Sequence, residues 1–157
     1  METKVSKLRK RNDTARDFSR SPKFSNILVA IDGSENANRA LEVAITLKKN
    51  YHSNLLILNA VQISKYGKQF GKYSEEDARR FVNEAVSISK KEGVSAVGEV
   101  KHATVSVVET IIESAAKEKS DLIVIGARGL GGFKRLLLGS VSNGVVTHAN
   151  CDVLVVR

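Results

Sequence analysis

The chain has 157 residues, of which 42% are hydrophobic, and its 25 Lys and Arg outnumber 17 Asp and Glu to give a formal net charge of +8. This length favours one domain with its own core. The single cysteine, Cys151, excludes an internal disulfide, so a reducing, cytoplasmic compartment is expected. No apolar run approaches the roughly 18 residues that a membrane span needs, and the first residues lack the apolar segment of a signal peptide.

Much of the positive charge lies in residues 1–24, where eight basic residues stand against three acidic ones, a net +5. This segment contains the only proline, Pro22, and has no hydrophobic periodicity. Such a composition cannot bury enough apolar surface to offset the entropy lost on ordering. We therefore predict a disordered basic arm over residues 1–24, able to bind an acidic partner or a polyanion. Residues 25–157 are expected to form the folded domain.

From residue 26 onward, apolar runs and helical spacings alternate. Ser74 and Asp77 have the spacing of a capping box, and Ser34 is a suitable helix N-cap. The predicted order is a strand at 26–31, a helix from Ser34 to about Asn50, a strand at 55–61, a long connection at 62–73, a helix from Ser74 to about Gly93, a strand at 96–102, a helix from Thr104, a strand at 122–125, a helix from Gly139-Ser140 and a strand at 152–157. This βαβαβαβαβ order predicts an α/β fold, a parallel sheet with helices on both faces.

The stretch from Asp121 to Ala149 contains a glycine-rich loop between a buried strand and a helix start. Its spacing, G-x2-G-x9-G-S, begins at Gly126 and is neither that of a P-loop nor that of a dinucleotide fingerprint. The N–H groups at a helix start have no internal partner, and the helix dipole favours an anion there. Glycines allow close backbone approach and positive φ. A phosphate site is the favoured interpretation, and a ligand-free turn is the alternative.

At these residues the chain resembles the universal stress protein family, in particular its ATP-binding subgroup. The similarity includes KRLLLGSVS around Ser140, THA in the last helix, the terminal VLVVR and ILVAIDGS near the start, and it extends from about Phe24 to Arg157. It implies a Rossmann-like fold of the adenine nucleotide alpha hydrolase type, with five parallel strands in the order 3-2-1-4-5. It also implies ATP as ligand, with or without Mg²⁺, and a homodimer through the C-terminal strand.

The candidate site residues come from the ends of the predicted strands at 26–31, 55–61 and 122–125 and from the loops that follow the first and the last of these. Asp32 offers a carboxylate to a ribose hydroxyl or to a phosphate-bound metal, and a plain Asp-Gly turn is the alternative. The resemblance implies that the Ala60 main chain contacts the adenine edge, although a strand end in the core is equally expected. For the serines at the last helix start, capping is compatible with phosphate binding. The predicted nucleotide site comprises Asp32, Ala60, Gly126, Arg128, Gly129, Gly139, Ser140, Val141 and Ser142.

No catalytic constellation stands out. The three histidines lack metal-ligand spacing, and there is no nucleophile elbow, paired carboxylate motif or arginine-finger signal. We therefore expect an ATP-binding stress-response protein that acts as a sensor or adaptor. A slow ATPase or phosphotransfer enzyme on the same site is one alternative, and a scaffold with a structural nucleotide is another.

Overall fold

Strands and helices alternate along the whole described part of the chain, which is residues 24–63, 73–130 and 137–157 of a computed structural model. The elements are β1 (Asn26–Ala30), α2 (Glu35–Tyr51), β2 (Asn54–Gln62), α3 (Glu75–Lys91), β3 (Val97–Ala103), α4 (Val107–Lys117), β4 (Leu122–Gly126), α5 (Ser140–His148) and β5 (Asp152–Val156). The predicted arm, apart from Phe24, and most of the connection predicted over 62–73 lie outside the described residues.

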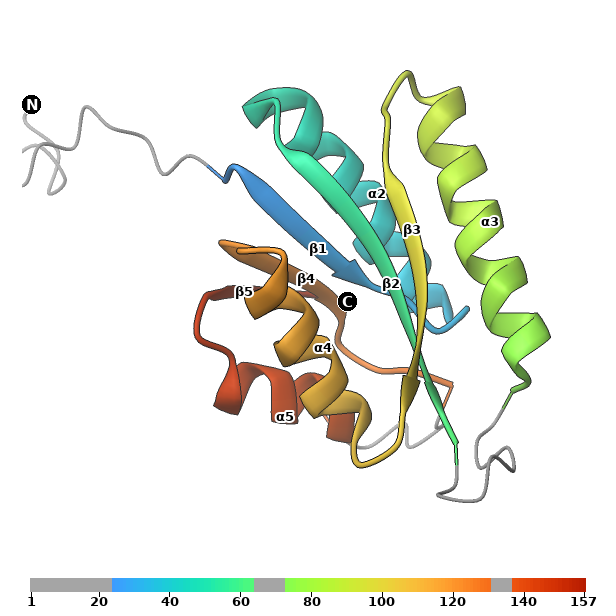
Figure 1. Ribbon diagram of the computed structural model, residues 1–157. Helices are drawn as coiled ribbons and strands as arrows, with labels where there is room; N and C mark the ends of the chain where they lie inside the picture. Colours follow the sequence, from blue (N-terminus) through green and yellow to red (C-terminus); the bar gives the residue numbers. More distant parts are fainter. Residues whose placement is uncertain (1–23, 64–72, 131–136) are drawn as a thin grey trace, which may run out of the picture.

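The five strands form one parallel sheet in the order β3-β2-β1-β4-β5, which confirms the predicted α/β fold and strand order (Figure 1). Strand β1 is central, with Ala30 opposite Leu58 of β2 on one side and Ile125 of β4 on the other. The chain leaves β1 toward one edge of the sheet and later fills the other edge from β4. This reversal is a topological switch point, where ligands of open α/β sheets bind beyond the carboxyl ends of the strands.

The sheet is covered on both faces, with α2 and α3 on one side and α4 and α5 on the other (Figure 1). Successive side chains of β1 alternate between these layers, because Ile27 and Val29 pack toward α2 and α3 while Leu28 and Ala30 pack toward α4 and α5. All four are buried, which explains why this strand is an unbroken apolar run. Full burial of each large aliphatic side chain contributes roughly 1.5–3 kcal/mol.

Two of the predicted helix starts are confirmed by their caps. The Ser34 hydroxyl accepts a hydrogen bond from the Ala37 N–H at 3.2 Å, and Ser74 and Asp77 form a reciprocal capping box. The predicted start of the third helix at Thr104 is wrong. That helix, α4, begins at Val107, with the Ser106 hydroxyl accepting from the Val108 N–H at 3.1 Å.

The reason for this shift lies in the preceding strand. Strand β3 stays paired with β2 as far as Ala103, opposite Gln62, so the chain turns only after that residue. In the described parts of the chain, no helix combines the length and the apolar character needed to cross a bilayer.

Candidate functional site

A cavity of about 550 Å³ lies beyond the carboxyl ends of β1, β2 and β4. This volume is typical of small-molecule sites, which span roughly 300–1,000 Å³. All nine residues of the predicted site line it, together with residues that sequence reasoning did not select. The lining is formed by Ala30, Ile31, Asp32, Ser34, Ala37, Leu58, Ala60, Val61, Gln62, Tyr73, Val107, Ile111, Ile125, Gly126, Arg128, Gly129, Leu130, Gly139, Ser140, Val141 and Ser142.

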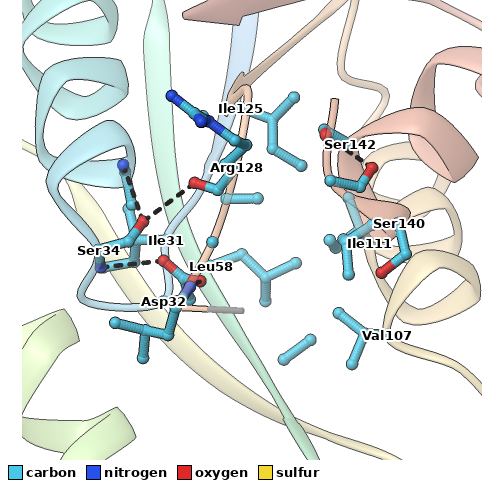
Figure 2. A pocket seen from close by; sticks show the side chains of 18 of the residues that line it. Ile31, Asp32, Ser34, Leu58, Val107, Ile111, Ile125, Arg128, Ser140 and Ser142 are labelled. Carbon is cyan, nitrogen blue, oxygen red and sulfur yellow. Dashed lines mark hydrogen bonds between the residues drawn. The ribbon is translucent and has the colours of Figure 1, made fainter. Parts of the chain in front are cut away.

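The cavity has two polar walls separated by an apolar floor (Figure 2). Asp32 and Ser34, from the turn after β1, lie on one side, and Ser140 and Ser142 of α5 lie on the other. Apolar side chains from β2, β4 and α4 form the floor between these walls: Leu58, Ile125, Val107 and Ile111. The arrangement suits a ligand with an apolar, planar part and polar groups at two ends.

The Asp32 carboxylate joins the two loops that the sequence predicted to meet. Its Oδ1 accepts from the Ser34 N–H at 3.0 Å, which is the local turn bond, and its Oδ2 accepts from the Leu130 N–H at 3.1 Å. The Ser34 hydroxyl also donates to the Arg128 carbonyl at 3.4 Å. Asp32 therefore acts as a turn residue and as a bridge to the glycine loop. Because each carboxylate oxygen can accept more than one hydrogen bond, this partly exposed side chain retains capacity toward a ligand.

Two of the three signature glycines, Gly126 and Gly129, are needed for space rather than for an unusual backbone conformation. A Cβ at Gly126 would lie 2.8 Å from the Asn36 carbonyl carbon at the start of α2, and a Cβ at Gly129 would overlap Asp32 Oδ2. A Cβ at Gly139 would make only ordinary contacts of 3.5 Å or more. Positive φ occurs at none of the three, so that part of the prediction is wrong.

Among the described glycines, positive φ belongs to Gly33 (81°) and Gly93 (74°). Gly33 follows Asp32 in the turn after β1, and the Phe81 ring of α3 occupies the space that a side chain there would need. This packing holds the turn against α3.

The N-terminus of α5 faces the cavity. Gly139 is the N-cap, and no side chain caps this helix, so the expectation that Ser140 or Ser142 caps it is wrong. The first-turn N–H groups of Ser140, Val141 and Ser142 have no acceptor within a helix. Ser140 is exposed, whereas the Ser142 hydroxyl is buried, donates to the Ala127 carbonyl at 2.8 Å and lies 3.0 Å from the Gly139 carbonyl. Ser142 can therefore meet a ligand only through its main chain.

Ala60 lies where β2 extends beyond the end of β1. The last main-chain bond between the two strands runs from the Ile31 N–H to the Leu58 carbonyl at 2.9 Å. In a parallel ladder every second residue directs both its N–H and its C=O to the same side. The N–H and C=O of Ala60 therefore point past the end of β1, and within the described residues no main-chain partner takes them.

Sequence reasoning missed two polar residues next to this point. Asn59 is fully buried, and its amide donates to the Ile31 carbonyl at 2.9 Å. The Tyr73 hydroxyl donates to Asn59 Oδ1 at 3.3 Å, and the Tyr73 ring meets Phe81 edge-on. Burial, together with the nearby Asp32 charge, raises the Tyr73 pKa, so the hydroxyl keeps its proton. The available signal was one asparagine within the apolar run LLILNAV.

A protein-built metal site is not found in the described residues, where no group of three or more His, Cys, Asp or Glu gathers. Asp32 is the one carboxylate in the described cavity lining, and it already accepts two N–H groups. These residues fit Mg²⁺ only as an ion carried on the phosphates of a ligand, with Asp32 as at most one protein ligand.

Comparison with known proteins gives one consistent result. The sequence model of the universal stress protein family matches residues 23–157. A Staphylococcus aureus (strain USA300) protein assigned to the universal stress proteins is 35% identical over 141 residues, which cover 85% of this chain and 84% of that protein.

Solved structures agree with this match. The universal stress protein UspA from Lactobacillus plantarum superimposes with a TM-score of 0.74 at 24% identity, covering 87% of this chain and 100% of that one. A universal stress protein solved in complex with cAMP has a TM-score of 0.65 at 25% identity, covering 87% of this chain and 99% of that one.

Proposed function

Because this chain belongs to the universal stress protein family, we propose that it binds ATP and acts as a cytoplasmic, nucleotide-dependent sensor or adaptor in stress response. The observation that carries the proposal is that an apolar floor, a carboxylate and a helix N-terminus line one cavity. A similar universal stress protein binds cAMP, which supports an adenine nucleotide as the ligand class.

Each part of the cavity suits one part of the nucleotide. The apolar floor around Leu58 and Ile125 accepts the flat adenine ring, and the free main-chain groups of Ala60 offer it a donor and an acceptor. Asp32, on the polar wall opposite Ser140, can accept a hydrogen bond from a ribose hydroxyl. The start of α5, with the Ser140 hydroxyl and the adjoining Arg128, supplies N–H groups and a favourable dipole for phosphates.

ATP is proposed over smaller adenine nucleotides because the glycine signature of the ATP-binding subgroup is complete from Gly126 to Ser140. Binding is favoured over turnover because Asp32 is the one carboxylate in the described lining, and a carboxylate engaged with the ribose or with a phosphate-bound metal is not available to activate water. A general base needs a free acceptor within reach of the attacking water. Slow ATP hydrolysis is the second candidate, and release of phosphate by purified protein with Mg²⁺ would establish it.

The direct test is to identify the ligand and measure its affinity. Mass spectrometry of material released from freshly purified protein should detect an adenine nucleotide. Calorimetry with ATP, AMP and cAMP, each with and without Mg²⁺, should give the tightest binding for ATP. The proposal is wrong if none of these nucleotides binds at millimolar concentration, and tighter binding of AMP or cAMP would replace ATP as the ligand.

A further inference from the structure

The hydrogen-bond ladder between β1 and β2 ends with a side chain in place of a main-chain group. In a regular parallel ladder, a residue that donates to position j−1 of its neighbour accepts from position j+1. The Ile31 N–H donates to the Leu58 carbonyl, so the regular donor to the Ile31 carbonyl would be the Ala60 N–H. The buried Asn59 amide donates to that carbonyl instead, at 2.9 Å.

This exchange leaves the Ala60 main chain available at the cavity wall. The side chain of Asn59 satisfies the Ile31 carbonyl from the α2 and α3 side of the sheet, where residues of the same parity in β2, Leu55 and Ile57, also pack. The N–H of Ala60 is then not needed by β1. Ala60 is 93% shielded from solvent but lines the cavity, so a ligand is the natural partner for its N–H and C=O.

We propose that Asn59, held in place by Tyr73, is a positioning residue that sets the base specificity of the cavity by keeping the Ala60 main chain free to pair with the edge of adenine. The inference rests on the proposed function, since it assigns how that same site recognises its nucleotide. Asn59 itself contacts no ligand and acts through the ladder end that it holds.

The chemistry of the two base edges explains the specificity. Adenine presents a donor at N6 and an acceptor at N1, which complement the C=O and N–H of Ala60. Hypoxanthine presents the reverse, with an acceptor at O6 and a donor at N1. A base with the wrong edge leaves the main-chain groups unpaired in a dry site, which lowers affinity sharply.

Tyr73 holds the Asn59 amide in place. The two ends of an amide are close in shape, and their neighbours decide which end is the donor. The Ile31 carbonyl can only accept, so the NH₂ end faces it, and the Tyr73 hydroxyl, which can donate or accept, donates to Asn59 Oδ1 at 3.3 Å. The Tyr73 ring is in turn fixed against Phe81, with ring centroids 5.5 Å apart.

The test compares affinities for ATP and ITP, which differ only at the base edge. Wild-type protein should prefer ATP by roughly tenfold or more, the scale of one lost and one opposed hydrogen bond. In Asn59→Leu the Ile31 carbonyl recruits the Ala60 N–H, so ATP affinity should fall about tenfold while ITP affinity changes by less than about threefold. Tyr73→Phe should lower the ATP preference by a smaller factor, about threefold.

Ser89→Ala is the matched control, because Ser89 is also fully buried and donates to the Ala85 carbonyl at 2.9 Å in α3, outside the cavity lining. It should leave the ATP-to-ITP ratio unchanged. If Asn59→Leu does not fold, Tyr73→Phe decides alone. The proposal is overturned if both nucleotides lose affinity equally in the folded variants, or if wild-type protein binds ATP and ITP alike. Failure of wild-type protein to bind either nucleotide would instead overturn the proposed function.

Discussion

At the scale of single residues, the space around Gly129 and Gly139 predicts that substitution by alanine weakens ATP binding at the first position and not at the second. In Gly129→Ala the new Cβ overlaps Asp32 Oδ2, so the carboxylate must move and its bond to the Leu130 N–H is lost. Overpacking of this kind costs about 1–3 kcal/mol, and ATP binding should weaken by a similar amount. In Gly139→Ala the Cβ meets only ordinary contacts at a φ of −72°, so affinity should stay close to wild type. Calorimetry measures both, and equal losses would contradict the steric argument.

Asp32 provides the second test at this scale. Asp32→Ala removes an acceptor that we expect to meet the ribose, so ATP binding should weaken by about 1–3 kcal/mol, the scale of a lost charged hydrogen bond. Asp32→Asn keeps the shape and one acceptor oxygen, and it serves as the matched variant. Titrations with and without Mg²⁺ separate a ribose contact from a metal contact, because only the metal contact makes the loss depend on the ion. No measurable loss in either condition would leave Asp32 only its turn bond and its bridge to the Leu130 N–H.

How far single residues could be predicted depends on what determines their roles. Asp32 follows β1 and Gly126 ends β4, both buried apolar strands, so strand order alone brought them to one edge. The role of Asn59 depends on where β1 stops, and the role of Gly129 depends on a carboxylate 97 positions earlier in the chain. Neither relation leaves a local pattern, so sequence reasoning selected Gly129 for its backbone freedom rather than for its contact with Asp32, and it missed Asn59.

At the scale of elements, strands were easier to predict than the start of α4. Strands β1 and β4 are short apolar runs between turn residues, and their bounds match the prediction within a residue. The start of α4 depends on how long β3 remains paired with β2, which is a tertiary property. A local signal existed, because Ser106 and Glu109 have capping-box spacing, but Thr104 lies closer to the end of the strand.

The cap of α3 predicts a pH dependence. The Ser74 N–H and hydroxyl donate to Asp77 and hold the pKa of that carboxyl below its ordinary value of 3.8, and nearby Arg80 acts in the same direction. A carboxyl whose pKa is lower in the folded than in the unfolded state stabilises the folded protein at pH values above its unfolded-state pKa. This contribution is lost as the pH falls through the folded-state pKa. Wild type should therefore be more stable than Asp77→Asn at neutral pH, and denaturant titrations should show this difference shrinking below about pH 4. A difference independent of pH would contradict the role of the charge.

At the scale of the whole molecule, β5 provides an edge on which a second copy can pair. The Val156 carbonyl accepts a hydrogen bond from the Ala127 N–H, so the main chain of Val156 faces β4. Because neighbouring residues of a strand face opposite sides, Val153 and Val155 direct their N–H and C=O groups to the open side. In the described residues no strand covers that side, and Leu154 is 37% exposed. Antiparallel pairing of two β5 strands about a two-fold axis would satisfy both edges at once.

This arrangement predicts a homodimer that Val155→Pro disrupts. Proline removes an N–H on the open side of β5 while the bond between Val156 and Ala127 remains possible. Light scattering should report a dimer for wild type and a monomer for the variant. Leu154→Pro is unsuitable as a control because it would break the ladder with β4. A wild-type monomer at micromolar concentration, or a variant that dimerises as well as wild type, would exclude this interface.

The predicted basic arm over residues 1–24 gives a further prediction, which concerns the binding of polyanions by the full-length chain. With a net charge of +5 it should bind polyanions such as heparin or nucleic acid weakly, with an affinity that falls steeply as salt increases. Removing residues 1–23, which keeps Phe24 packed against the core and against Tyr51, should abolish this binding and leave ATP affinity unchanged. Polyanion binding of equal strength without the arm would assign it to the folded domain instead.

The bond between Asp32 and the Leu130 N–H also has a consequence for folding, because it joins residues 98 positions apart. Contacts between residues so far apart in the sequence form late in folding, because closing a large loop costs conformational entropy. A chain still being synthesised has made β1 and its turn long before β4 emerges to complete the cavity. A bound nucleotide would thus distinguish finished molecules from partial ones, and by mass action it would raise their melting temperature in proportion to the logarithm of its free concentration.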